Sequence, residues 1–221
     1  MISIRLIPAM LVVASAAQAQ TSVVIDEASF TFTRGGVAYG NESFKIIRRT
    51  GPDGIEYVAK GTRTIEGRIV KTALTADSSG SAMSYSRATT GGSAAQLTAR
   101  RALNRLTITE QGGQSSTRDY VFAPGTVILD DDAIHQLYFV TWRDPRAVGY
   151  MTPARRTSTQ GVLTEVAREN LTVGSGTIPA AKFVFGTGDA TREIWVDSER
   201  RLLRVSYPAQ RITGTRDLPP R

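Results

Sequence analysis

The sequence predicts an all-β protein, in which one antiparallel sheet is curved or closed into a half-open barrel and holds a single buried helix in its concave side. Three observations lead to this class. Apolar and polar residues alternate through most of the chain, and glycine, proline and asparagine turn signals return about every 8 to 12 residues. Residues 130–142 are the one convincing helix, and after the three aspartates at its start the segment is apolar on nearly every side.

The first nineteen residues have the pattern of a secretory signal peptide. Arg5 gives a positive start, residues 6–17 are mostly apolar, and the small-x-small tripeptide ending at Ala19 is the cleavage pattern of signal peptidase. We therefore expect a mature chain that begins at Gln20 and works in the periplasm or outside the cell. The stretch is a poor membrane anchor because Pro8 interrupts it, so no transmembrane segment is expected in the mature chain.

Composition excludes several kinds of site. With 41% apolar and 21% charged residues the chain can bury a core, and with no cysteine it has no disulfide, thiolate zinc site or cysteine nucleophile. The net charge of +7 falls by one when Arg5 leaves with the leader, and nearly all of the excess is arginine. Arginine doublets recur at positions 48–49, 100–101, 155–156 and 200–201.

Two interpretations of the doublets stay open. They form a patch for an anionic envelope surface or acidic lipid headgroups, or they are spread over a solvated surface. Nucleic acid is not expected as a partner, because no helix concentrates the positive charge.

Residues 22–121 are predicted to form an antiparallel meander. Phe30 and Phe32 alternate with Thr31 and Thr33, so the two phenylalanines should share the inner face. Glycine pairs near positions 35 and 51–54 mark the first turns. Further strands are expected at residues 68–75, 82–88, 94–102, 105–110 and 118–122.

The predicted helix follows this meander. Asp130, Asp131 and Asp132 can cap its free amide groups, and Pro145 should stop it. The chain then returns to strands, expected at residues 148–152, 157–169, 177–185, 192–197 and 202–207. One domain over residues 20–208 is the simplest organisation, and the polar, proline-bearing residues 209–221 are expected to form a loose tail.

Few residues suggest catalysis. His135 is the only histidine, and Asp131 and Asp132 precede it by one helical turn, so an acid–base dyad is one hypothesis and a plain helix cap is the other. The string around Ser93 lacks the second glycine of a hydrolase elbow. We assign no catalytic residue, metal or cofactor from the sequence, and an enzyme is the less favoured class.

Aromatic residues are the better candidates for a binding site. They recur at strand spacing and within the helix, where they either line a cavity between sheet and helix or pack as an ordinary core. The candidate ligand-binding residues are Phe30, Phe32, Phe44, Tyr57, Tyr138, Trp142 and Trp195.

The order of the elements also carries a family resemblance. A Pro-Gly-x-x-x-Leu-Asp segment leads from Pro124 into the helix. Four short motifs follow it in the second half: Leu171-Thr172-Val173-Gly174, Thr177-Ile178-Pro179-Ala180, Glu193-Ile194-Trp195-Val196-Asp197 and Arg201-Leu202-Leu203-Arg204-Val205. In this the chain resembles a group of uncharacterised secreted bacterial proteins, and its architecture resembles the half-barrels of the Lol-type lipoprotein carriers. The resemblance implies a cavity for acyl chains or another apolar ligand, and it supplies no catalytic residues.

Three functions therefore remain open at this point. The preferred one is binding of an apolar or lipid-like ligand in the cell envelope without catalysis. The second is a periplasmic structural or assembly factor with no small ligand. The third is an envelope hydrolase that uses Asp131, Asp132 and His135.

Overall fold

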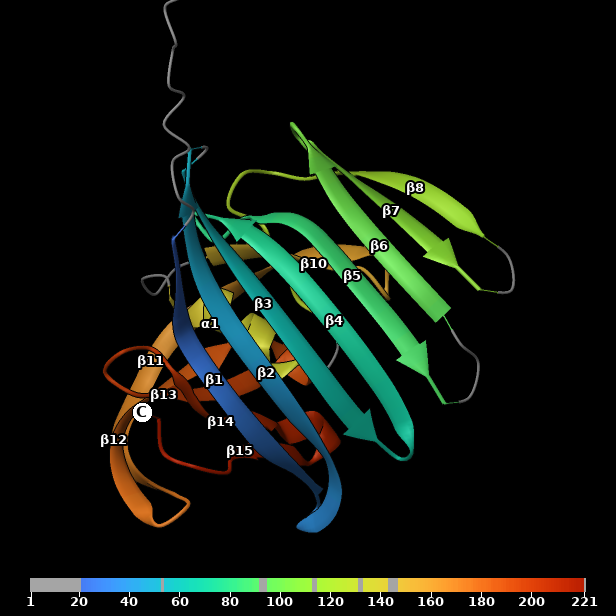
Figure 1. Ribbon diagram of the computed structural model, residues 1–221. Helices are drawn as coiled ribbons and strands as arrows, with labels where there is room; N and C mark the ends of the chain where they lie inside the picture. Colours follow the sequence, from blue (N-terminus) through green and yellow to red (C-terminus); the bar gives the residue numbers. More distant parts are fainter. Residues whose placement is uncertain are drawn as a thin grey trace, which may run out of the picture.

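The computed structural model describes residues 21–52, 54–91, 95–112, 115–130, 133–142 and 147–220. The predicted signal peptide lies outside these residues. Within them the chain forms one curved sheet of 15 strands in the order β8-β7-β6-β5-β4-β3-β2-β1-β15-β14-β13-β12-β11-β10-β9 (Figure 1). The predicted all-β class and curved sheet around a helix are confirmed.

The first eight strands follow one another as an antiparallel meander. Their bounds are β1 Thr21–Arg34, β2 Val37–Gly51, β3 Gly54–Ile65, β4 Arg68–Asp77, β5 Ala82–Thr90, β6 Ala95–Ala102, β7 Arg105–Gln111 and β8 Ser116–Val121. Phe30 and Phe32 are fully buried while Thr31 is exposed, which confirms the period of two in β1. Because neighbouring side chains on a strand point to opposite faces, this alternation fixes which face holds the core.

The remaining strands form the opposite wall. They are β9 Val127–Ile128, β10 Ala147–Thr152, β11 Thr157–Val173, β12 Gly176–Phe185, β13 Arg192–Val196, β14 Leu202–Tyr207 and β15 Ile212–Arg216, with short 3₁₀ turns η2 Gly188–Ala190 and η3 Pro208–Gln210. All neighbouring pairs are antiparallel except β9 with β10.

The expectation of a loose tail after residue 208 is wrong. β15 lies between β1 and β14, with Phe30 opposite Arg216 and Arg34 opposite Ile212, so it joins the two walls. Gly214 faces the interior, where a side chain would not fit: a Cβ at this position would lie 2.5 Å from the Ile134 side chain. Because Gly214 and Arg216 occupy buried positions of β15, the segment lacks the apolar alternation by which a strand is predicted from sequence.

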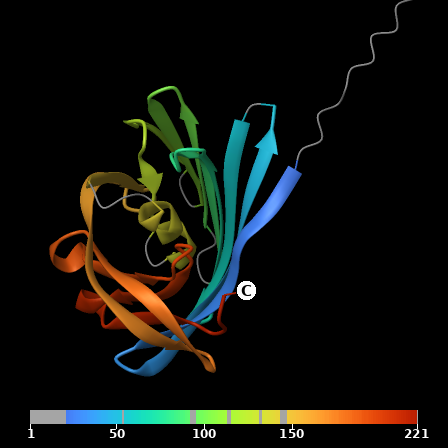
Figure 2. The ribbon, with the colours of Figure 1, turned by 90° about the vertical axis from the view of Figure 1, so that its left-hand side faces the viewer.

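The helix is shorter than predicted and is capped differently. A 3₁₀ turn, η1 Ile134–Leu137, continues into α1 Tyr138–Thr141, and Ala133 at the N-cap makes no side-chain hydrogen bond. The Asp130 carboxylate instead accepts a hydrogen bond from the Tyr85 hydroxyl at 2.7 Å. Asp131, Asp132 and Pro145 lie outside the described residues. The predicted burial is confirmed, since every residue of η1 and α1 is buried between the two walls (Figure 2).

The two walls also meet on the far side from β15. The N–H of Ala82 at the start of β5 donates to the carbonyl of Thr126 at 3.1 Å, just before β9. Strands β6, β7 and β8 extend beyond this contact as a projecting unit, the wing (Figure 1). Within the described part of the chain, no helix has the length and apolarity that a membrane crossing requires.

Candidate functional site

The helix is anchored to the sheet by a carboxylate that is distant in sequence. Glu42 on β2 accepts hydrogen bonds from the backbone N–H groups of Ile134 and His135 at 3.2 and 3.1 Å. The same carboxylate lies 2.6 Å from Nδ1 of His135, and Nε2 of that ring lies 3.2 Å from the hydroxyl of Thr72 on β4. Glu42 thus supplies the helix cap that the sequence assigned to the aspartates, because the first amides of a helix have no partner within it.

In this arrangement His135 holds the start of the helix against strands β2 and β4. Glu42 and His135 are each 1% exposed, and both ring nitrogens have partners. A Cβ at Gly61 would lie 2.5 Å from Cε1 of His135, so the ring sits directly on the backbone of β3. Carboxylate, imidazole and hydroxyl occur in the order of a hydrolase triad, but here they lie within the packed interior.

Most of the predicted ligand-binding aromatics come together in the core. Phe30 and Phe44 stack with ring centroids 5.8 Å apart and are 0% and 4% exposed. Phe32 is also fully buried and packs in the same cluster. These three side chains fill the deep interior and contact other core residues.

Trp195 lies apart from the other candidates. It belongs to a separate apolar cluster with Leu171, Val173, Ala180 and Leu203. Its indole N–H donates to the Glu169 carboxylate, and the Lys182 ammonium lies 4.7 Å from the ring centroid. The structure therefore removes Trp195 from the candidate site.

The other three aromatics meet where α1 ends. The rings of Tyr57 and Trp142 touch edge to face with centroids 4.4 Å apart, and Trp142 stacks on Tyr138 at 6.0 Å. On the sheet, Arg48 lies opposite Tyr57 on one side and opposite Val23 on the other. Val23 is 49% exposed and Trp142 is partly exposed. We call these five residues the rim cluster.

The phenols of the rim cluster are held in their neutral form. Burial raises the pKa of Tyr57, and Arg48 beside it acts in the opposite direction. Burial raises the pKa of Tyr138 to about 12, with further contributions from Tyr57 and Asp26. Neutral hydroxyl groups beside a guanidinium give the rim both hydrogen-bond donors and a positive charge.

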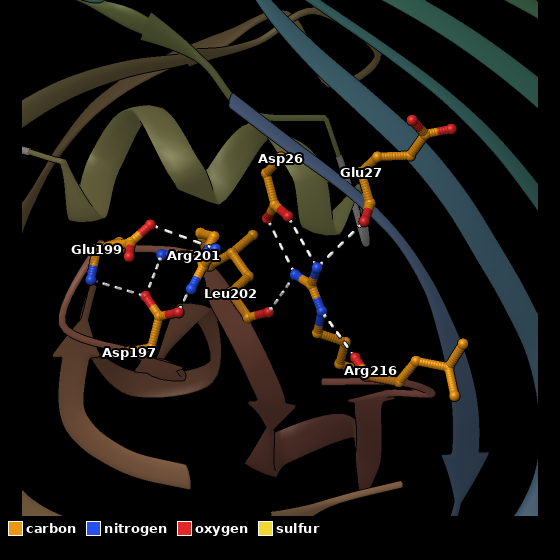
Figure 3. A network of polar contacts seen from close by, with 8 residues as sticks. Asp26, Glu27, Asp197, Glu199, Arg201, Leu202 and Arg216 are labelled. Atoms are coloured by element: carbon orange, nitrogen blue, oxygen red, sulfur yellow. Dashed lines mark hydrogen bonds and ion pairs between the residues drawn. The ribbon is translucent and has the colours of Figure 1, made fainter. Parts of the chain in front are cut away.

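An open groove of about 910 Å³ borders the part of β1 that β15 does not cover. Lys45 and Lys60 line it, and Lys45 pairs with Glu27 at 2.9 Å. Arg216 and Asp26 also line the groove, and the Arg216 guanidinium donates to both Asp26 oxygens at 2.9 and 3.0 Å. Arg216 also donates to the main-chain carbonyls of Leu218, Leu202 and Glu27, and Figure 3 shows this network beside that of Arg201, with Leu202 and Glu27 labelled.

The arginine doublets do not form one patch. One member of each doublet is held in an ion pair, and the four pairs lie on different elements: Arg49 with Glu56, Arg101 with Asp77, Arg156 with Glu110 and Arg201 with Asp197. The signal that sequence reasoning missed was Arg48, the other member of the first doublet, which faces Tyr57 across β2 and β3.

Comparisons with known proteins assign no family to the chain. No family model matches the chain. No curated protein matches it either. Among solved structures, it is similar to a crystal structure described as a β-barrel-like protein of a domain of unknown function, DUF1849, from Brucella abortus. The two share 6% identity with a TM-score of 0.47 over 86% of this chain and 94% of that chain.

Proposed function

We propose that the protein is exported, with its leader removed after Ala19, and binds an apolar or lipid-like ligand at the rim cluster in the cell envelope. One observation carries the proposal, namely the contact of Tyr57, Tyr138 and Trp142 beside Arg48 where the buried helix ends. The resemblance to Lol-type carriers is part of the same proposal.

The chemistry of the rim cluster suits an amphiphile. Tyrosine and tryptophan present an apolar ring with one polar tip, and the open ends of β-barrels are common places for ligands. The exposed side chain of Val23 extends the apolar surface. Arg48 is suited to an acidic head group, because a guanidinium forms strong charge-assisted hydrogen bonds with carboxylate and phosphate. Phe30 and Phe44 occupy the deep interior, so we assign the ligand to the rim.

The two tryptophans allow a direct test by fluorescence. Oleate added to the Trp195→Phe variant should shift the emission of Trp142, whereas the Trp142→Phe variant, which keeps Trp195 in its separate cluster, should show no shift. Equal responses from the two variants would contradict the proposal. Mass spectrometry of an organic extract of the purified protein should in addition show a bound amphiphile.

The acidic head group is tested by Arg48→Gln. This change should weaken oleate binding about tenfold, since it removes one charge-assisted pair, and should leave oleyl alcohol binding within about twofold. Arg49→Gln is the matched control, because Arg49 already pairs with Glu56 at 3.4 Å. If both arginine variants bind oleate like the parent, the assignment of Arg48 is wrong.

The alternative is an assembly factor without a small ligand. The groove along β1 favours it, because β1 runs past the end of β15 and an extended segment of a partner could lie there. A stable partner captured by crosslinking from Lys45 or Lys60, together with an empty organic extract, would support this function over the first.

A further inference from the structure

One end of the wing carries exposed apolar side chains on neighbouring strands. Leu103 in the β6–β7 turn is 96% exposed, and Val121 at the end of β8 is 82% exposed. Strand register places Val121 beside this turn, since Arg105 lies opposite both Ala102 and Val121. Met83, near the start of the adjoining strand β5, is 40% exposed. We call this end the wing tip. It lies at the same end of the molecule as the start of β1 (Figure 1).

Leu103 is an unexpected residue for its backbone position. Only two residues, Leu103 and Asn104, connect β6 to β7, and Leu103 has a φ of 56°. Glycine or asparagine normally takes such a position in a hairpin turn, because a side chain strains the backbone there. With 96% of its surface exposed, the leucine gains no packing that offsets the strain. An exposed, strained leucine therefore points to an interaction outside the fold.

Positive charge surrounds these apolar residues. Arg100 is exposed, and within the described residues it has no ion-pair partner. Arg105 is exposed and pairs with Asp119 at 3.4 Å on the surface, where such a pair is weak. Arg101 is held by Asp77 at 3.0 Å. The wing tip thus combines a projecting leucine with flanking guanidinium groups.

We infer that the wing tip docks on the surface of an anionic phospholipid bilayer. Leu103 would enter the interface between headgroups and acyl chains, and Arg100 and Arg105 would contact the lipid phosphates. Apolar area and basic residues add to each other in binding at such a surface. This inference goes beyond the proposed function, because docking of the wing tip requires no ligand at the rim cluster.

The lack of cysteine in the chain allows a site-specific test. Leu103→Cys, in the chain from Gln20 onward, is labelled with an environment-sensitive fluorophore and mixed with vesicles of phosphatidylglycerol and phosphatidylethanolamine. We expect a blue shift of emission that weakens at high salt and is absent with phosphatidylcholine vesicles. Val37→Cys is the matched control, because Val37 is 71% exposed in the β1–β2 turn at the opposite end, and it should show no shift.

An unlabelled variant tests the contribution of the leucine itself. Leu103→Asn suits the backbone position, so the melting temperature should hold or rise, while sedimentation with the anionic vesicles should fall about tenfold. Arg100→Gln should reduce sedimentation about fivefold. Retained vesicle binding in Leu103→Asn, or equal shifts from the labels at positions 103 and 37, would overturn the inference. Rim-cluster variants should leave vesicle binding unchanged, so failure of one proposal is distinguishable from failure of the other.

Discussion

Nδ1 of His135 lies 2.6 Å from a Glu42 oxygen, and this contact joins the helix to the sheet across 93 residues of sequence. The same carboxylate receives two backbone N–H groups of the helix start. The Glu42 carboxylate therefore accepts hydrogen bonds from three buried donors, two backbone N–H groups and the imidazole N–H, which would otherwise have no partner. Because each unpaired buried donor is costly, Glu42 should be among the most sensitive polar positions of the protein.

Replacing Glu42 with alanine should lower the free energy of unfolding by about 3 kcal/mol or more, because the His135 ring and two backbone amides would stay buried without a hydrogen-bond acceptor. Denaturant unfolding followed by circular dichroism measures the loss. The control is Glu56→Gln, whose surface pair with Arg49 should contribute less than about 1 kcal/mol. Equal losses in the two variants would show that the buried contact does not hold the helix.

Local patterns predicted the strands well, and they did so for a physical reason. Alternation in β1 reports the two faces of a single strand, so Phe30 and Phe32 reveal the core without knowledge of their partners. The cap on the helix could not be predicted in this way, since Glu42 meets the helix only after the sheet has curved. The aspartates before the helix offered a nearer explanation, and Asp130 in fact pairs with Tyr85.

The other errors have local causes. β15 was missed because Gly214 and Arg216 take inward positions that apolar residues usually fill. Trp195 was grouped with the core aromatics, but Ile194 and Val196 on either side of it belong to the main core cluster, so strand alternation places Trp195 on the other face of β13. For the rim cluster, the sequence supplied the aromatic members and missed Val23 and Arg48.

Gly61→Ala should displace the helix. The added Cβ would lie 2.5 Å from Cε1 and 2.6 Å from Nδ1 of His135, and the ring is held on its other sides by Glu42 and Thr72. We expect a loss of about 1 to 3 kcal/mol in unfolding free energy, which is typical of overpacking. Gly51→Ala is the matched control, because its Cβ would meet no atom within 4 Å. A Gly61 variant as stable as the control would mean that the ring moves aside freely.

The buried pair of Asp26 and Arg216 should show strong coupling. Arg216→Met leaves the Asp26 carboxylate buried at 1% exposure without its partner, and this should cost about 3 to 5 kcal/mol. The double variant Asp26→Leu with Arg216→Met should be less destabilised than the sum of the single changes by about 2 kcal/mol. Urea unfolding of the four proteins measures the coupling, and simple additivity would refute it.

Tyr138 should make the protein sensitive to alkali. Burial, with Tyr57 and Asp26 nearby, raises the pKa of Tyr138 to about 12 in the folded state, whereas an unfolded tyrosine titrates near 10. A folded-state pKa above the unfolded one contributes stability that is complete below about pH 10 and is lost as pH rises toward about 12. Unfolding free energies measured across this interval should therefore fall, and Tyr138→Phe should fall less steeply because phenylalanine does not ionise. An identical slope in the two proteins would show that Tyr138 is not the group responsible, and Tyr57, whose pKa burial also raises, would be the next residue to replace.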